Sequence, residues 1–277
     1  QFLLTMAGNF RFKLIIYPED HNLLERVYNE IMVENFSEDE LDPFSQWVKM
    51  YTDPGICVCN VMVAFDKEDA EMKKILSVCV FEFFQPSNCF LLTYLVVDPS
   101  CKGKGVGVFL VMECWKEMQR VTKRINGSPH PDVVFVEVED PSKYTEGSGG
   151  TDPADRVRMF QHMGVKFLTD FNFVQPALSE DSKPMDDLLL GAIIIPNTPH
   201  VDRQYYVPSK QLRAFVDAYY RDVYDDKFEC EDYRKQMEQL DQQDKFLLRN
   251  VQLPPRKPRA RAAALHSKPA SSINCHV

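Results

Sequence analysis

Apolar and polar residues follow one another along the first two thirds of the chain with two different periods. Short runs rich in Val, Cys, Phe and Leu are typical of strands. Longer stretches with apolar residues three or four positions apart are typical of helices. We expect strands at 12–16, 56–65, 75–84, 89–97, 133–138, 165–169 and 187–195. We expect helices at 21–36, 37–51, 106–124 and 155–163. This alternation predicts a mixed α/β domain.

Local signals mark where several of these elements begin and end. Ser37 and Glu40 form the S-x-x-E pattern of a capping box, which predicts a helix from there through Tyr51. Gly164 is a natural end for the helix before it. The segment 140–153 contains three Gly together with Pro, Ser, Thr and Asp, and we therefore expect a mobile loop there.

The character of the chain changes after residue 200. An amphipathic helix is predicted at 209–223, and its apolar stripe must be buried against another element. That stripe consists of Leu212, Phe215, Val216, Tyr219 and Val223. A second, Gln-rich helix is predicted at 230–248, and the Pro-, Arg- and Ala-rich end cannot bury enough apolar surface to order itself. We therefore divide the chain into a domain at 10–200, a C-terminal helical extension at 201–250 and a disordered basic tail at 251–277.

Charge is distributed unevenly along the 277 residues. Residues 250–277 hold five basic residues and no acidic one, so the body of the chain carries −14 within a total of −9. An acidic body argues against a nucleic-acid interface, because phosphate binding needs clustered Lys and Arg. The basic tail leaves open a second interpretation, in which it serves as a nuclear-targeting or nucleic-acid-tethering arm.

Eight cysteines are present without a CxxC pair and without His at metal-ligand spacing. Several lie in apolar runs, where Cys behaves as a small buried hydrophobe, so we expect buried thiols and no metal site. No run approaches the roughly 20 apolar residues that span a bilayer, and the first ten residues lack the basic flank of a signal peptide. These features predict a reducing, cytoplasmic setting without membrane contact, or a nuclear one through the tail.

The strongest chemical signal is a strand–loop–helix run at 91–115. Gly103, Gly105 and Gly107 lead directly into the helix, and Lys102 and Lys104 add two cations. Glycines there let backbone N–H groups approach an anion, and the helix N-terminus adds partial positive charge. The pattern indicates phosphate or pyrophosphate binding, although tight turns also need Gly for purely structural reasons. It has neither GxxxxGK[ST] nor GxGxxG spacing.

This run resembles the central signature of the GNAT superfamily of N-acetyltransferases, in which V-x-P is followed by [RQ]-x-x-G-x-[GA] at the start of a long helix. The matching positions are Val97, Pro99, Lys102, Gly105 and Gly107, and Lys102 departs from the usual Arg or Gln but keeps a donor. Downstream, 135–141 and 158–168 resemble the family's fifth strand and its short helix with the following strand. The segment 173–178, FVQPAL, is similar to a bacterial-type branch, so the resemblance covers 10–196.

The resemblance implies an α/β GNAT-like fold with a mixed, mostly antiparallel central sheet, splayed between strands 4 and 5 and flanked by helices on both faces. It also implies acetyl-CoA as co-substrate, without a metal. Its pyrophosphate would bind to Lys102 and to the amides of Gly103, Lys104, Gly105, Val106 and Gly107. Free backbone groups at Leu95 and Val97, on the splayed fourth strand, would hold the pantetheine arm and polarise the thioester carbonyl.

The catalytic groups depart from the family pattern. Phe160 stands where many members have a Tyr acid, and Thr93 stands where others have a Glu. The candidates that remain are Glu137 as general base and Tyr94 on the strand beside the splay. The helix residue His162 has a suitable pKa in principle, and Cys101 before the loop is a candidate reactive thiol.

Two functions follow from these residues. The first is an acetyl-CoA-dependent N-acetyltransferase that passes the acetyl group directly to an amine of a small molecule or a protein. The alternative is a catalytically degenerate domain that binds an acyl-CoA or a partner without turnover.

Overall fold

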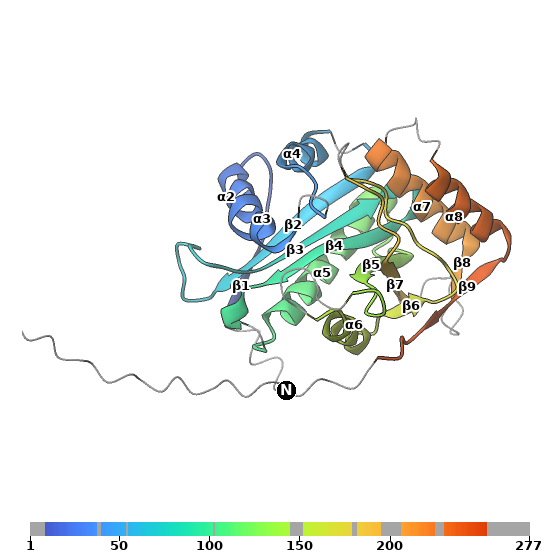
Figure 1. Cartoon of the computed structure of the whole chain (residues 1–277). Coiled ribbons are helices and arrows are strands. Elements are labelled where there is room, and N and C mark those ends of the chain that lie inside the picture. Colours follow the sequence, from blue (N-terminus) through green and yellow to red (C-terminus); the bar gives the residue numbers. More distant parts are fainter. Residues whose placement is uncertain are drawn as a thin grey trace, which may run out of the picture.

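The computed structural model describes residues 9–37, 40–53, 55–101, 103–144, 152–178, 182–194, 206–224 and 230–253. Within them, nine strands form a sheet in the order β1-β2-β3-β4-β5-β7-β6-β9-β8 (Figure 1). The strands are β1 (Phe10–Leu14), β2 (Cys57–Asp66), β3 (Ile75–Phe84), β4 (Cys89–Val97), β5 (Val133–Glu139), β6 (Lys166–Leu168), β7 (Leu188–Ile194), β8 (Tyr206–Pro208) and β9 (Lys245–Arg249). Every pair is antiparallel except β4 with β5. The predicted fold class is confirmed.

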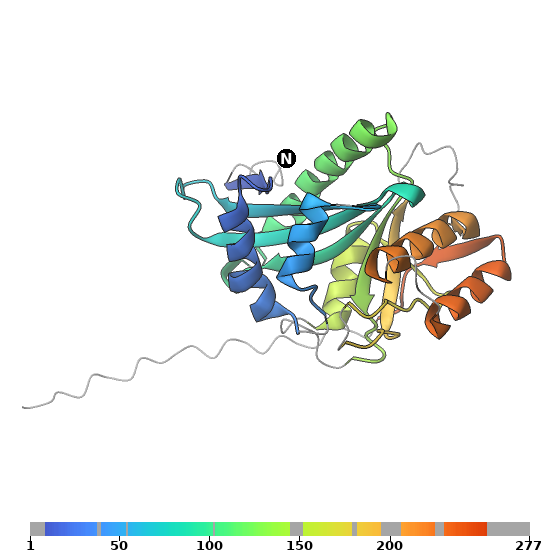
Figure 2. The same ribbon diagram turned by 90° about the horizontal axis from the view of Figure 1, so that it is seen from above.

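Helices cover both faces of the sheet (Figure 2). They are α2 (His21–Arg26), continued by a π-helical turn (Val27–Met32) and α3 (Val33–Asn35), then α4 (Phe44–Thr52), α5 (Val106–Asn126), α6 (Pro153–His162), α7 (Ser209–Tyr224) and α8 (Glu231–Asp241). Alternate residues of a strand point to opposite faces. On β3, Phe81 and Phe83 therefore face α5, whereas Val80 faces the α2–α4 side and Phe84 faces α7. Helices α4 and α7 thus share one face of the sheet, and α5 and α6 share the other.

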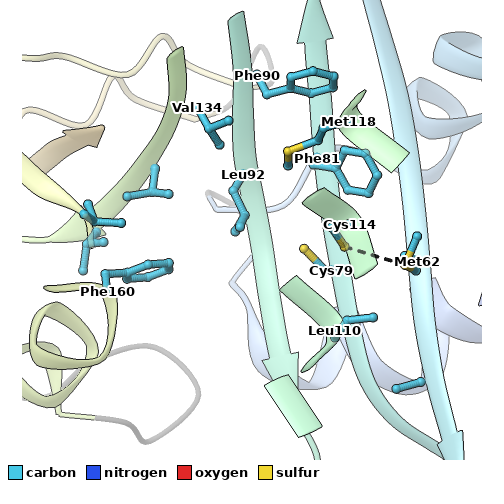
Figure 3. Close-up of a cluster of buried hydrophobic side chains, with 14 of the residues drawn as sticks. Met62, Cys79, Phe81, Phe90, Leu92, Leu110, Cys114, Met118, Val134 and Phe160 are labelled. Atoms are coloured by element: carbon cyan, nitrogen blue, oxygen red, sulfur yellow. Dashed lines mark hydrogen bonds between the residues drawn. The ribbon is translucent and has the colours of Figure 1, made fainter. Parts of the chain in front are cut away.

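The core between the sheet and α5 contains aromatic rings, aliphatic side chains and thiols (Figure 3). Phe83 and Phe90 lie with ring centroids 4.7 Å apart, and the Cys114 thiol contacts Met62 Sδ at 3.8 Å. Cys57 and Cys89 are completely buried. The seven cysteines among the described residues are free thiols, as the apolar surroundings predicted.

The sheet divides into two branches at the single parallel pair. The β4–β5 ladder joins Cys89–Leu92 to Val133–Val136 and extends no further, although β4 continues to Val97 and β5 to Glu139. Beyond Leu92 and Val136 the strands separate, and we call this point the fork. Thr93 and Glu137 are the first residues past it. The predicted splay between the fourth and fifth strands is present.

A β-bulge lies at the fork. The register of β3 against β4 passes from Val80↔Tyr94 to Phe81↔Leu92, which leaves Thr93 as an extra residue on β4. A bulge interrupts the alternation of side chains, so the neighbours Thr93 and Tyr94 both face the α4 side. Leu92 before them and Leu95 after them belong to the α5 side.

One predicted helix begins later than the sequence indicated. The helix expected at 37–51 begins only at Phe44, because a proline at position 43 disfavours helical backbone at the residue before it. The capping bonds still form, with Ser37 Oγ donating to Glu40 Oε2 at 2.8 Å, but they close an isolated turn.

The C-terminal region contributes strands as well as helices. The helix expected at 230–248 ends at Asp241, and Lys245–Arg249 forms β9, which pairs with β6 and with β8. Phe246 and Leu248 are buried and Leu247 is half-buried. This strand pattern covers only five residues, so the sequence does not distinguish it from the end of the predicted helix. Strands β8 and β9 therefore extend the central sheet, so this region adds strands to the C-terminal helical extension that the sequence indicated.

Helix α7 is anchored on the sheet by aromatic stacking. The Phe215 ring stacks on Phe135 of β5 at 4.3 Å between centroids and meets Phe84 of β3 edge-on at 5.5 Å. The apolar stripe predicted for this helix is buried as required, with Leu212, Phe215 and Val216 fully enclosed. This anchoring places α7 beside α4, above the fork.

Candidate active site

The turn between β4 and α5 carries the glycines that the sequence identified. Gly103 and Gly105 have φ values of 81° and 80°, in the left-handed region where side chains are strained. Gly105 is the N-cap of α5, and no described side chain caps that end. The first helical N–H groups, at Val106 and Gly107, lack intrahelical acceptors. The amide donors of Val106 and Gly107 and the positive end of the helix dipole therefore form a candidate anion-binding site beyond the end of β4.

The other predicted positions of this turn differ in what they offer. The amide of Lys104 donates to the Cys101 carbonyl at 3.1 Å and is therefore occupied within the turn. A Cβ at Gly107 would lie 2.8 Å from Cγ2 of Val97, so Gly107 is needed for the close contact of α5 with β4. Lys102 lies outside the described residues.

The fork supplies the backbone groups predicted at the end of β4. Leu95 pairs with Cys79 and Val97 pairs with Ser77, both on β3. On its other edge β4 has left its ladder with β5 by this point. The backbone of the outer half of β4 is thus paired on one side and borders the fork on the other.

A pocket of about 160 Å³ lies above the fork, between α4 and α7. Glu82 of β3 and Thr93 of β4 form its floor, and Asp42 and Asp222 bring two further carboxylates to its lining. No Lys, Arg or His is among the described residues that line it. Its apolar lining residues are Pro43, Met50, Leu178 and Val223.

The floor of this pocket is a buried carboxylate. Glu82 is only 5% exposed; its Oε2 accepts a hydrogen bond from Thr93 Oγ1 at 3.0 Å, and its Oε1 has no partner among the described residues. Burial, reinforced by the charge of Asp42, raises the pKa of Glu82 well above its usual range. Burial likewise raises the pKa of Asp42 to about 6, against the opposing effect of the hydrogen bond from Tyr94.

The two acids on β5 have different environments. Glu139 forms an ion pair with Arg156 at 3.0 Å. Glu137 is half-buried as a whole, but its Oε1 is completely enclosed and has no hydrogen-bond partner. Burial first, and the charge of Asp42 second, raise the pKa of Glu137 to about 8. A carboxyl group that titrates near neutral pH beside the fork is suited to proton transfer.

The pKa of Glu137 predicts a pH-dependent stability. The folded chain holds this proton up to about pH 8, whereas the unfolded chain releases it near 4.5. Unfolding therefore releases a proton between these values, and the free energy of unfolding falls as pH rises, by up to about 1.4 kcal/mol per pH unit. In Glu137→Gln this contribution disappears, so the variant should gain stability over wild type progressively from pH 5 to pH 8. Urea unfolding at pH 5, 6, 7 and 8 measures the difference, and a constant difference would contradict the assignment.

Comparisons with known proteins bear on the fold. No protein-family model matches the chain, and no curated protein matches it. Among solved structures, the ribosomal-protein-S18-alanine N-acetyltransferase of Escherichia coli is 11% identical, with a TM-score of 0.43 over 69% of this chain and 99% of the other. Arabidopsis thaliana NAA60 in complex with acetyl-CoA is 15% identical, with a TM-score of 0.41 over 67% and 98%. Tetrahymena GCN5 is 15% identical, with a TM-score of 0.42 over 69% and 99%.

At these sequence identities the similarities do not indicate an activity or a substrate. The topology itself supplies the decisive observation: one parallel strand pair, β4 with β5, divides an otherwise antiparallel sheet, and a glycine turn joins β4 to the long helix α5. The chain has the GNAT fold.

Within this GNAT fold, two residues considered in the sequence analysis, Phe160 and Tyr94, cannot serve as a proton donor at the fork. Phe160 of α6 is buried in the core on the α5 side (Figure 3). Tyr94 is buried against Phe36, and its hydroxyl contacts the Glu40 carbonyl at 2.9 Å and Asp42 Oδ2 at 3.2 Å. Tyr94 therefore positions Asp42 and does not itself line the pocket.

The remaining candidates lie away from the fork. His162 is exposed at the end of α6, and its Nδ1 contacts the Arg158 carbonyl at 2.6 Å. Cys101 is buried beneath the glycine turn. Among the described residues no group of three His, Cys, Asp or Glu side chains is placed to hold a metal ion, and no described helix is long and apolar enough to cross a membrane.

Sequence reasoning missed Glu82, Asp42 and the contribution of α7. One signal was available: Glu82 interrupts the apolar run VCVFEFF, where an acid must be buried with the strand. Asp42 and Asp222 carried no such signal. They meet only because α4 and α7, separated by more than 150 residues, lie on the same face of the sheet.

Proposed function

We propose that the protein is an acetyl-CoA-dependent N-acetyltransferase that passes an acetyl group directly to an amine. The observation that supports the proposal is the fork, which is bordered by the strand that leads to the glycine turn and by the strand that carries Glu137 with its unpartnered oxygen. The turn follows β4, and Glu137 is the first residue of β5 past the fork.

The glycine turn fits the anionic part of the co-substrate. Gly105 holds a left-handed conformation at the helix start, and its bare Cα leaves the approach to the Val106 and Gly107 amides clear of a side chain. When bound, acetyl-CoA supplies the thioester carbonyl that the amine attacks. The outer half of β4 offers backbone groups on the side of the fork, which support Leu95 and Val97 as partners of the pantetheine arm.

Glu137 supports the role of general base. An alkylamine arrives as an ammonium ion and must lose a proton before it can attack a carbonyl. Glu137 is half-buried beside the fork and its Oε1 has no competing donor among the described residues, so the carboxyl group can accept that proton directly or through a water molecule. The proton can then pass to the thiolate that leaves, which returns Glu137 to its starting state.

One observation favours the alternative, a domain that binds acyl-CoA without turnover. Phe160 has no proton to give, and the Tyr94 hydroxyl is engaged with Glu40 and Asp42. The usual acid of the family therefore has no counterpart at either position. The cytoplasmic or nuclear location stays a prediction, because the basic tail beyond residue 253 lies outside the described residues.

Titration with acetyl-CoA, followed by measurement of free-thiol release, separates the two functions. We expect saturable binding and thiol release that depends on an added amine, tested over short aliphatic amines, polyamines, aminoglycosides and peptide amines. Tight binding without thiol release from any amine would establish the inert binder. Absence of acetyl-CoA binding by the folded protein would overturn both.

A further inference from the structure

The pocket between α4 and α7 identifies the class of amine, and this inference rests on the proposed function. Three carboxylates line it, from Asp42, Glu82 and Asp222, and none of its described lining residues is basic. Glu82 is 5% exposed, and its Oε1 has no hydrogen-bond partner among the described residues. Because Glu82 lines the pocket, this oxygen is open to a ligand, and one carrying N–H groups would supply the missing donor.

The charge of that ligand follows from the same residues. Burial raises the pKa values of Glu82 and Asp42, and repulsion from the neighbouring carboxylates of Asp42 and Asp222 raises the pKa of Glu82 further. An ammonium group between them would reverse that repulsion and lower both pKa values. A neutral hydroxyl would bring hydrogen bonds but no charge, and an anion would be repelled.

The size of the ligand follows from the pocket volume. About 160 Å³ is close to an engineered cavity of roughly 150 Å³ that holds benzene, a molecule of six heavy atoms. Met50, Leu178 and Val223 give the pocket apolar walls suited to methylene groups. The polar floor lies at Glu82 and Thr93, next to the fork where the acetyl group would be presented.

We infer that the pocket takes a primary ammonium group on a four-carbon chain, with the nitrogen on Glu82 and Asp42 and the carbon chain between α4 and α7. Two sources share this chemistry: one end of a short aliphatic diamine, and a lysine side chain. Helix α7, which the C-terminal region adds to the fold, closes the pocket with Tyr219 and Val223 and sets the chain length.

The test is direct binding to the full chain in the absence of acetyl-CoA. We expect n-butylamine and 1,4-diaminobutane to bind at least roughly tenfold more tightly than 1-butanol, which matches the amine in length but carries no charge. Calorimetry at pH 7 in buffers of different ionisation enthalpy should show proton release with the amines and none with 1-butanol. Nα-acetyl-lysine amide distinguishes the sources: affinity equal to n-butylamine indicates a lysine side chain, and affinity only for the free amines indicates a small molecule.

Matched variants assign the effect to the pocket. Glu82→Gln should weaken n-butylamine binding roughly tenfold or more and reduce proton release, and Asp42→Asn serves as the second variant if Glu82→Gln does not fold. Glu113→Gln removes the same charge from α5, on the other face of the sheet, and should leave amine affinity unchanged. Equal affinity for n-butylamine and 1-butanol, or unchanged affinity in both folded pocket variants, would overturn the inference.

The inference and the proposed function fail in distinguishable ways. If the protein binds the amine but does not bind acetyl-CoA, the pocket assignment stands and the proposed transferase function is overturned. Thiol release with bulky or uncharged amines, without binding of n-butylamine, would retain the transferase and overturn the pocket assignment.

Discussion

Gly105→Asp should abolish acetyl-CoA binding while the fold persists. The substitution places a carboxylate at the N-cap of α5, where it would accept the helix N–H groups and repel the pyrophosphate. The expected loss is at least roughly 100-fold in affinity, since an attractive contact becomes a repulsive one between anions. Isothermal titration with acetyl-CoA measures it.

Gly105→Asn is the matched control. Asn has almost the same shape as Asp and tolerates the left-handed backbone that Gly105 adopts. Its Cβ meets the same neighbour, Phe109 Cε2, at 3.3 Å. The control therefore reports the cost of shape alone, and it should bind acetyl-CoA more tightly than Gly105→Asp. Equal affinities in the two variants would assign the loss to geometry, and wild-type affinity in folded Gly105→Asp would remove the cofactor assignment.

Glu137→Gln should lower turnover roughly 100-fold, the low end for the loss of a general base, with acetyl-CoA affinity unchanged. At pH 7 an alkylamine of pKa near 10 is only about 0.1% neutral, so its reaction depends on a base. Because the pKa of Glu137 is about 8, the carboxylate form accumulates as pH rises. The wild-type rate with alkylamines should therefore climb through this range. In the variant the part of that climb due to Glu137 should disappear, which leaves only the rise of the neutral amine fraction with pH.

Anilines provide the chemical control, because they are already neutral at pH 7 and need less help from a base. Their turnover should fall much less in Glu137→Gln than the turnover of alkylamines does. Glu113→Gln, on the far side of the sheet, should leave both unchanged. Equal and small losses for both classes of amine in Glu137→Gln would assign Glu137 to a structural role.

The sequence by itself determined the local features of this protein. Glycine at 103 and 105 signals a backbone that other residues resist, and periodic apolar residues identified β2 to β5 and helix α5 within a few positions. These signals are readable because each depends on neighbours along the chain. The family resemblance extended them to the splay between β4 and β5, and the structure contains it.

The tertiary structure decided which residues line the proposed amine-binding pocket. The bulge at Thr93 turns two consecutive side chains to one face, and no local pattern in LLTYLVV predicts it. Glu82, Asp42 and Asp222 converge from three elements far apart in sequence, and only packing on a shared sheet brings them together.

The same physical reason separates Glu137 from Glu139. The two acids stand two residues apart on one strand, and their sequence contexts are similar. Arg156 of α6 reaches Glu139 at 3.0 Å, whereas Glu137 Oε1 is enclosed without a partner. Burial and the distance to other charges set a carboxyl pKa, and both are properties of the folded chain. The sequence could name Glu137 as a candidate, and the fold gave it a pKa near that of a working base.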